Sequence, residues 1–136
     1  MTDVWDGIAS EFLHPYPSGA RLLAVAGTDA ERARHAADAL AAALASAGQR
    51  VDRAHTADGD EQALRADVID PFRAERPSGT VLLASGPAAL LSESARGIWN
   101  FSVWLVAEDE APHAAASALV DIADPAHPRR RWADSC

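Results

Sequence analysis

The stretch from Arg21 to Leu44 constrains the fold most, because a single glycine joins a short apolar run to a long helical pattern. The run Leu22–Ala26 is uniformly apolar, as expected of a central strand that is covered on both faces of a parallel sheet. Gly27 allows a tight turn, and the alanine-rich residues after it predict a helix of about 18 residues. Strand, glycine turn and helix in this order form the frame of a phosphate-binding βα unit.

The residues after Gly27 do not complete a phosphate-binding loop. In the pattern GxxxxGK[ST], the second glycine lets backbone amides approach the phosphates, the lysine contacts them and the hydroxyl binds magnesium. These three positions hold Arg32, Ala33 and Arg34. The 12 basic side chains of the chain are all arginines, so no lysine can serve from another position. The sequence therefore disfavours a conventional lysine-dependent phosphoryl transfer.

A second interpretation of the same residues is structural. Thr28 and Glu31 have the S/T-x-x-E spacing of a capping box, in which the two side chains satisfy amides at the start of the helix. Asp29 and Glu31 also place negative charge at the positive end of the helix dipole, which stabilises the helix and repels a polyphosphate. Guanidinium groups suit phosphate and favour the opposite conclusion. We favour capping; the alternative is phosphate binding by Gly27, Thr28, Arg32 and Arg34.

Composition excludes several classes of protein. With 136 residues, 49% of them hydrophobic, the chain is expected to form one globular domain with a sizeable core. The formal net charge of −8 disfavours nucleic acids and anionic membranes as partners, because both require a concentrated basic surface. The basic run Arg129–Arg131 is expected to be solvated.

Cysteine content and hydropathy favour a cytoplasmic protein. Cys136 is the only cysteine, so an intramolecular disulfide and a cysteine-rich metal site are both excluded. The N-terminal residues lack the basic start and apolar core of a signal peptide, and no run of about 18 apolar residues occurs. We therefore expect neither a signal peptide nor a membrane span.

Strand and helix patterns alternate along the rest of the chain. The further expected strands are Arg50–His55, Thr80–Ala84 and Phe101–Val106. The further expected helices are Val4–Leu13, Glu61–Ala74, a short one from Pro87 to about Arg96, and Glu108–Ile122. This alternation predicts an α/β fold, a three-layer α/β/α sandwich around a parallel sheet of about four strands. The weakly apolar second strand is expected at an edge.

These patterns divide the chain into three parts. Residues 1–19 form an N-terminal helical segment and linker, residues 20–128 the α/β domain, and residues 129–136 a basic C-terminal tail.

Five stretches, in the same order, resemble the uridine kinase and phosphoribulokinase branch of the P-loop nucleoside kinases. They are RLLAVAG before ADALAAAL, ALRADVIDPF, TVLLASGPAALL, IWNFSVWLV and ADPAHPRRRW, and they cover most of the chain from Arg21 onward. This resemblance implies a sheet order of 2-3-1-4, with the phosphate loop after the first strand.

Residue by residue, the resemblance implies that functional groups are lost. The lysine position falls on Ala33, the magnesium-binding hydroxyl on Arg34, and the acid after the third strand on Ser85. The catalytic aspartate matches Asp58, and less well Asp60. Two acceptor-binding segments of the family are also missing. Because the losses affect phosphate, metal and acceptor together, the resemblance implies a degenerate member that keeps the scaffold.

Other constellations do not indicate a different chemistry. The five histidines are scattered without an HExxH pair, so no metal site is expected. The pattern GxSxG is absent around Ser85, and Asp58-Gly59-Asp60 has the composition of an ordinary turn. Trp104 is expected in the core, whereas Trp132 is a candidate anchor for another subunit.

The sequence thus predicts a catalytically inactive kinase-like domain that serves as a binding or assembly module, with a second copy or another protein as its partner. No cofactor is expected. The alternative is a residual nucleotide- or phosphate-binding protein, or an atypical uridine-kinase-like phosphotransferase, and only that alternative requires ATP and magnesium. A small enzyme of unrecognised chemistry is a third possibility.

Overall fold

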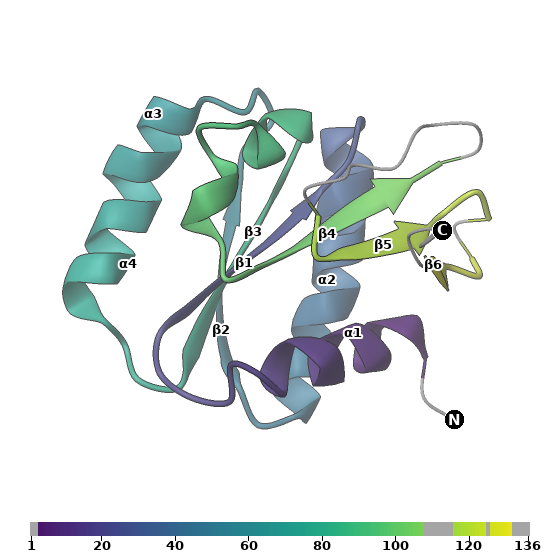
Figure 1. Ribbon diagram of the computed structural model, residues 1–136, viewed down its shortest axis with the longest axis horizontal. Helices are drawn as coiled ribbons and strands as arrows, with labels where there is room; N and C mark the ends of the chain where they lie inside the picture. The colour runs from purple at the N-terminus through teal and green to yellow at the C-terminus, as the bar shows by residue number, and fades with distance from the viewer. Residues whose placement is uncertain (1–2, 108–115, 125, 132–136) are drawn as a thin grey trace.

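A computed structural model describes residues 3–107, 116–124 and 126–131. A six-stranded sheet with the order β2-β3-β1-β4-β5-β6 lies between helices on both faces (Figure 1). The strands are β1 (Arg21–Ala26), β2 (Arg50–His55), β3 (Thr80–Gly86), β4 (Phe101–Val106), β5 (Ala118–Asp121) and β6 (Arg129–Arg131). The helices are α1 (Val4–Leu13), α2 (Ala30–Ser46), α3 (Glu61–Leu64) and α4 (Asp70–Glu75). A π-helical turn (Arg65–Ile69) joins α3 to α4, and 3-10 turns cover Ala88–Leu91 and Arg96–Ile98.

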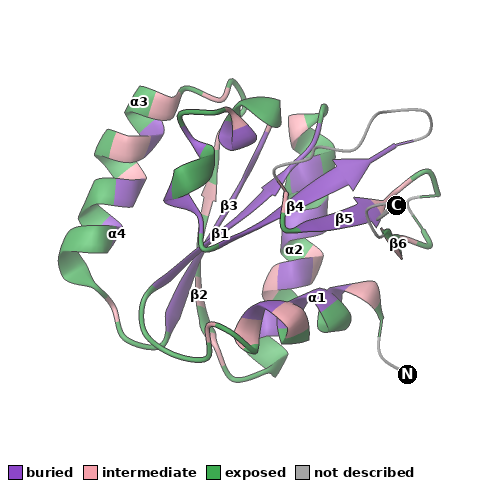
Figure 2. Cartoon of the chain, viewed as in Figure 1, coloured by how far each residue is buried: buried purple, intermediate pink, exposed green. Residues whose placement is uncertain are grey.

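The topology confirms the predicted fold class. Strands β1 to β5 pair in parallel, in the predicted order 2-3-1-4 for the first four, and β6 pairs antiparallel with β5. The weakly apolar β2 lies at an edge, as expected. The central strands β1, β3 and β4 are buried along their whole length (Figure 2), which is why their sequences are apolar on both faces.

Alternation along the strands builds two separate hydrophobic cores. Side chains such as Leu23 and Val25 of β1 pack with α1 and α2, whereas Leu22 and Ala24 pack on the other face with α3, α4 and the 3-10 turns. Trp104 lies buried in the second core, as predicted. The sheet is therefore the middle layer of an α/β/α sandwich.

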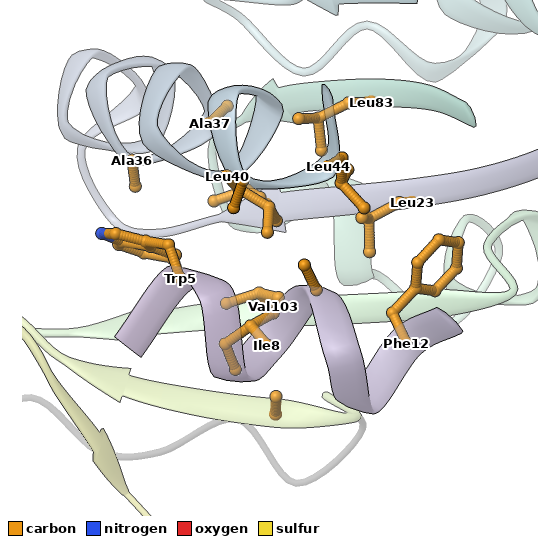
Figure 3. Packing of buried hydrophobic residues seen from close by; sticks show 14 of the residues in the cluster. Trp5, Ile8, Phe12, Leu23, Ala36, Ala37, Leu40, Leu44, Leu83 and Val103 are labelled. Carbon is orange, nitrogen blue, oxygen red and sulfur yellow. The ribbon is translucent and has the colours of Figure 1, made fainter. Parts of the chain in front are cut away.

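Helix α1 belongs to the first core. Asp3 caps its N-terminus by accepting a hydrogen bond from the Asp6 amide at 2.9 Å. Trp5, Ile8 and Phe12 lie on one face of α1 and point between α2 and the sheet (Figure 3). The N-terminal segment thus covers part of the sheet.

The C-terminal part differs from the predicted helix Glu108–Ile122. Residues 108–115 of that range lie outside the described residues, and Ala118–Asp121 form strand β5 instead of a helix. The pairing of β5 with β4 explains the difference, because Val120 packs in the first core and Leu119 in the second. A short segment that is buried on both faces is more stable as a strand than its alanine content suggests.

The run Arg129–Arg131, expected to be solvated, pairs with β5 as strand β6. The guanidinium of Arg130 binds the Glu11 carboxylate, with Nη2 and Oε1 3.1 Å apart, and donates to the Leu119 carbonyl at 3.2 Å. Its two neighbours remain exposed. The middle arginine is thus held by α1 and β5, which the charge pattern did not indicate.

The predicted helix from Pro87 to Arg96 is also replaced, by the two 3-10 turns. Trp132 lies outside the described residues. Within the described ranges, no helix combines the length and apolar character required to cross a membrane.

Candidate functional site

The carboxyl ends of β1, β2 and β3 meet at one edge of the sheet, where α/β proteins commonly bind ligands. The amide of Gly27, directly after β1, donates to the carbonyl of Gly86 at 3.3 Å, and the amide of Thr56, directly after β2, donates to the carbonyl of Ser85 at 2.9 Å. The loops that follow these three strands therefore lie side by side.

Gly27 is buried at this edge, where it packs against β4. A Cβ atom placed on Gly27 would lie 3.3 Å from Cβ of Leu105, a distance at which the leucine would have to shift. The lack of a side chain at Gly27 thus allows the chain after β1 to pack closely against β4.

Helix α2 begins at Ala30 with Asp29, not Thr28, as its N-cap. The Asp29 carboxylate accepts hydrogen bonds from the amides of Glu31 at 2.9 Å and Arg32 at 3.3 Å. The predicted capping box with Thr28 as the cap is therefore wrong in register, because the helix starts one residue later. The helix is still capped by its own sequence. The Asp29 carboxylate accepts hydrogen bonds from amides that would face a phosphate in a phosphate-binding loop.

Both arginines of this turn pair with acids of the same turn. Arg32 Nε lies 3.8 Å from Asp29 Oδ2, and Arg34 Nη2 lies 2.8 Å from Glu31 Oε2. About half of each guanidinium side chain is exposed, 52% for Arg32 and 51% for Arg34. Exposed pairs of this kind stabilise a protein by less than about 1 kcal/mol, so they do not hold the arginines rigidly.

The surface over this turn is shallow. Among the described residues, the hollow beside Gly27, Thr28, Asp29 and Arg32 is closed by Leu105, Ala107 and Ile122 and is too small to enclose a water molecule. Sites for nucleotide-sized ligands usually enclose about 300–1,000 Å³. Of the four candidate phosphate-binding residues, Gly27, Thr28 and Arg32 line this hollow and Arg34 does not. The hollow that the described residues form here is thus far smaller than a nucleotide site.

Asp58, the candidate catalytic aspartate, lies in the exposed loop between β2 and α3. Its carboxylate accepts hydrogen bonds from the Asp60 amide at 3.0 Å and the Thr56 hydroxyl at 3.1 Å. These two bonds, with the Asp60 amide as the larger cause, hold the pKa of Asp58 below its ordinary value. A general base works best when its pKa lies near the working pH. The lowered pKa of Asp58 lies further from neutral pH than that of an ordinary aspartate, which disfavours this role. Asp60 caps α3 by accepting from the Ala63 amide.

A contact that sequence reasoning missed links three polar side chains at this edge. His55 Nδ1 lies 2.8 Å from Ser85 Oγ, and His55 Nε2 lies 3.9 Å from Glu31 Oε1. The arrangement has the composition of a nucleophile, a base and an acid. However, Ser85 is completely buried, so no substrate can reach its hydroxyl, and the histidine instead satisfies a buried polar group.

No signal in the sequence could have paired these residues. His55 faces Ser85 because of the register between β2 and β3, which joins positions far apart in the chain. In the described ranges, no three histidine, cysteine, aspartate or glutamate side chains are grouped closely enough to hold a metal ion.

Comparisons with known proteins give a partial likeness in structure. No protein-family model matches this chain, and no curated protein matches it in sequence. Among solved structures, the fold is similar to that of a "putative fructose transport system kinase" from Silicibacter sp. TM1040, with 18% identity and a TM-score of 0.47. The match covers 85% of this chain and 77% of that protein's chain. At this identity and TM-score, the likeness assigns no activity to this chain.

Proposed function

We propose that this chain is a P-loop-kinase-like α/β domain without phosphotransfer activity that acts as a binding or assembly module. The proposal rests on one observation. The carboxylate of Asp29 accepts the amides of Glu31 and Arg32 at the N-terminus of α2, where a phosphate-binding loop would present amides to its ligand.

The chemistry of the surrounding positions supports this proposal. Ala33 and Arg34 stand where a kinase-like loop would place a lysine and a magnesium-binding hydroxyl, and Ser85 stands where an acid is expected. Ser85 is buried and is hydrogen-bonded to His55. Loss of a single charge-stabilising group in phosphoryl transfer can lower the rate by orders of magnitude, so the combined losses leave little basis for catalysis.

The negative charge at the start of α2 also supports the proposed lack of phosphotransfer activity. Asp29 caps α2 and Glu31 lies in its first turn, on a chain with a formal net charge of −8. Their carboxylates repel the phosphates of a nucleotide and also neutralise Arg32 and Arg34. The partner in this proposal is therefore a protein, either a second copy or a different chain. Sedimentation velocity over a range of concentrations distinguishes a homodimer from a monomer that awaits another partner.

A nucleotide titration tests the proposal. We expect ATP and GTP, with and without magnesium, to show no affinity tighter than about 100 μM, roughly −5.5 kcal/mol, in isothermal titration calorimetry. Tighter binding that is lost in Arg32→Ala, and kept in the control Arg96→Ala, would favour the alternative of a residual nucleotide binder. Phosphorylation of uridine by the same sample would establish an atypical phosphotransferase.

Removal of the cap should weaken the helix. We expect Asp29→Ala to lower the free energy of unfolding by about 1 kcal/mol, because two amides of α2 lose their acceptor. Asp29→Ser should recover most of the loss, since a serine hydroxyl can also cap a helix. Urea unfolding followed by tryptophan fluorescence measures both variants. Equal stability of wild type and Asp29→Ala would show that the carboxylate does not cap α2 in solution.

A further inference from the structure

A second cavity lies at the opposite edge of the sheet from the Gly27 turn. It has a volume of about 750 Å³ and is lined by residues that directly precede or begin β1, β3 and β4, together with the C-terminal end of α4. The chain segments that enter β1 and β3 approach this end of the sheet beside α4 (Figure 1). Its volume lies within the range of about 300–1,000 Å³ that is typical of sites for small molecules.

The floor of the cavity is apolar and firmly held. Leu22, Phe72, Ile98 and Trp99 line it, and each is at most 8% exposed. The indole Nε1 of Trp99 donates to the Leu90 carbonyl at 2.9 Å, which fixes the plane of the ring.

Asn100 fixes the adjacent start of β1. Its side-chain oxygen Oδ1 accepts a hydrogen bond from the backbone amide of Leu22, and its backbone amide donates to the Leu22 carbonyl. Both distances are 2.8 Å. The floor is thus held in place by these hydrogen bonds, and a preorganised floor lowers the entropic cost of binding.

The rim carries positive charge that is not neutralised locally. Arg73 and Arg76 line the cavity, and no aspartate or glutamate is among its described lining residues. In the part of the chain that the structure describes, neither arginine forms an ion pair, whereas both arginines of the α2 turn do. Arg73 Nη2 makes one long hydrogen bond to the Ile98 carbonyl, at 3.4 Å, which places this guanidinium over the floor and leaves its other N–H groups available.

Arg76 occupies an unusual backbone position. It ends α4 in the left-handed conformation, with φ 47° and ψ 57°, and precedes Pro77. Glycine is the usual residue at such a helix end, since other side chains are disfavoured there. No other non-glycine residue that the structure describes has a positive φ. A strained arginine at the mouth of a cavity is the kind of outlier that accompanies ligand binding.

We propose that this cavity binds a small organic anion. Arg73 and Arg76 hold its carboxylate or phosphate group through charge-assisted hydrogen bonds, and Phe72, Ile98 and Trp99 contact its apolar or aromatic body. The site lies at the opposite edge of the sheet from the N-terminal end of α2, so this inference is independent of the proposed loss of phosphotransfer at the Gly27 turn. A binding module with such a site would respond to a metabolite-sized acid.

NMR titrations of the full chain test the proposal with three related probes. Benzoate and phenyl phosphate carry the two possible anionic groups, and benzyl alcohol is their neutral counterpart. We expect at least one anion to shift the amide signals of Ser78, Gly97 and Asn100 and to bind at least about tenfold more tightly than benzyl alcohol, because only the anion forms charge-assisted bonds. The stronger anion identifies carboxylate or phosphate as the recognised group. Equal binding of all three probes, or the absence of shifts at these residues, would overturn the proposal.

Two variants locate the binding groups. Arg76→Gly removes one guanidinium and supplies the residue that the left-handed conformation favours, so its melting temperature should equal or exceed that of the wild type. Arg73→Gln removes the other charge from an exposed position. Each should weaken binding of the preferred anion by about tenfold or more, and Arg131→Gln, at an exposed position on β6, should leave it unchanged. Unaltered affinity in both cavity variants, or an equal loss in Arg131→Gln, would contradict the assignment.

Discussion

Phe12→Ala is expected to lower the free energy of unfolding by about 3–5 kcal/mol, the usual cost of deleting a buried phenylalanine ring. The ring is completely buried on α1. Its centroid lies 5.8 Å from that of Tyr16 and 5.7 Å from that of Phe101, which it meets edge to face. The cavity that remains cannot be filled easily, because Phe12 belongs to one packed cluster with side chains of α1, α2 and the sheet (Figure 3).

Urea unfolding measures this loss. Ser10→Ala is the matched control, since Ser10 is exposed on the same helix and should change stability by no more than about 0.5 kcal/mol. A loss below about 1 kcal/mol in Phe12→Ala would indicate that α1 is not an integral part of the core. The N-terminal segment would then be dispensable for the fold, contrary to the packing of Trp5 and Ile8.

Gly86→Ala is the second substitution with a large expected effect. A Cβ atom at this position would lie 2.7 Å from Cγ2 of Thr56 and 2.8 Å from the Thr56 carbonyl oxygen. The oxygen belongs to the backbone and cannot rotate away, and Gly86 is itself held by the Gly27 amide. We expect a loss of about 3 kcal/mol, at the upper end of the usual cost of overpacking.

Comparison with Gly97→Ala isolates the steric cause. A Cβ atom at Gly97 would meet no atom within 4 Å, and its φ is not in the left-handed range, so this control should remain within about 1 kcal/mol of wild type. Thr56→Ser in the Gly86→Ala background removes the Cγ2 contact but not the carbonyl contact, and should therefore recover only part of the stability. Full stability of Gly86→Ala would contradict the close approach of β2 and β3 at the candidate site.

Local patterns were sufficient to predict most of the sandwich. Strands β1, β3 and β4 were predictable because a strand that is covered on both faces must be apolar throughout. Alternation along β4 accordingly places Val103 in one core and Trp104 in the other. Helix α2 was predictable from the alanine-rich pattern after Gly27 and from the acids Asp29 and Glu31 at its start.

Local patterns failed where pairing between distant segments decides the conformation. Ala118–Asp121 has the alanine-rich context of a helix, yet it forms β5 because β4 offers a free parallel edge. Arg129–Arg131 is charged along its whole length, yet it pairs with β5, and Glu11 of α1 binds its middle guanidinium.

The candidate sites divide in the same way. Residue identities at short spacing were enough to show that no lysine, magnesium-binding hydroxyl or acid stands in the kinase-like positions, and that acids precede the alanine-rich helix. Three relations required the folded structure: Asp29 is the cap, His55 meets Ser85, and Arg73 and Arg76 line a cavity that has no acid among its described lining residues. Such relations depend on where a helix starts and on the register of neighbouring strands. Both are set by the packing of the whole chain.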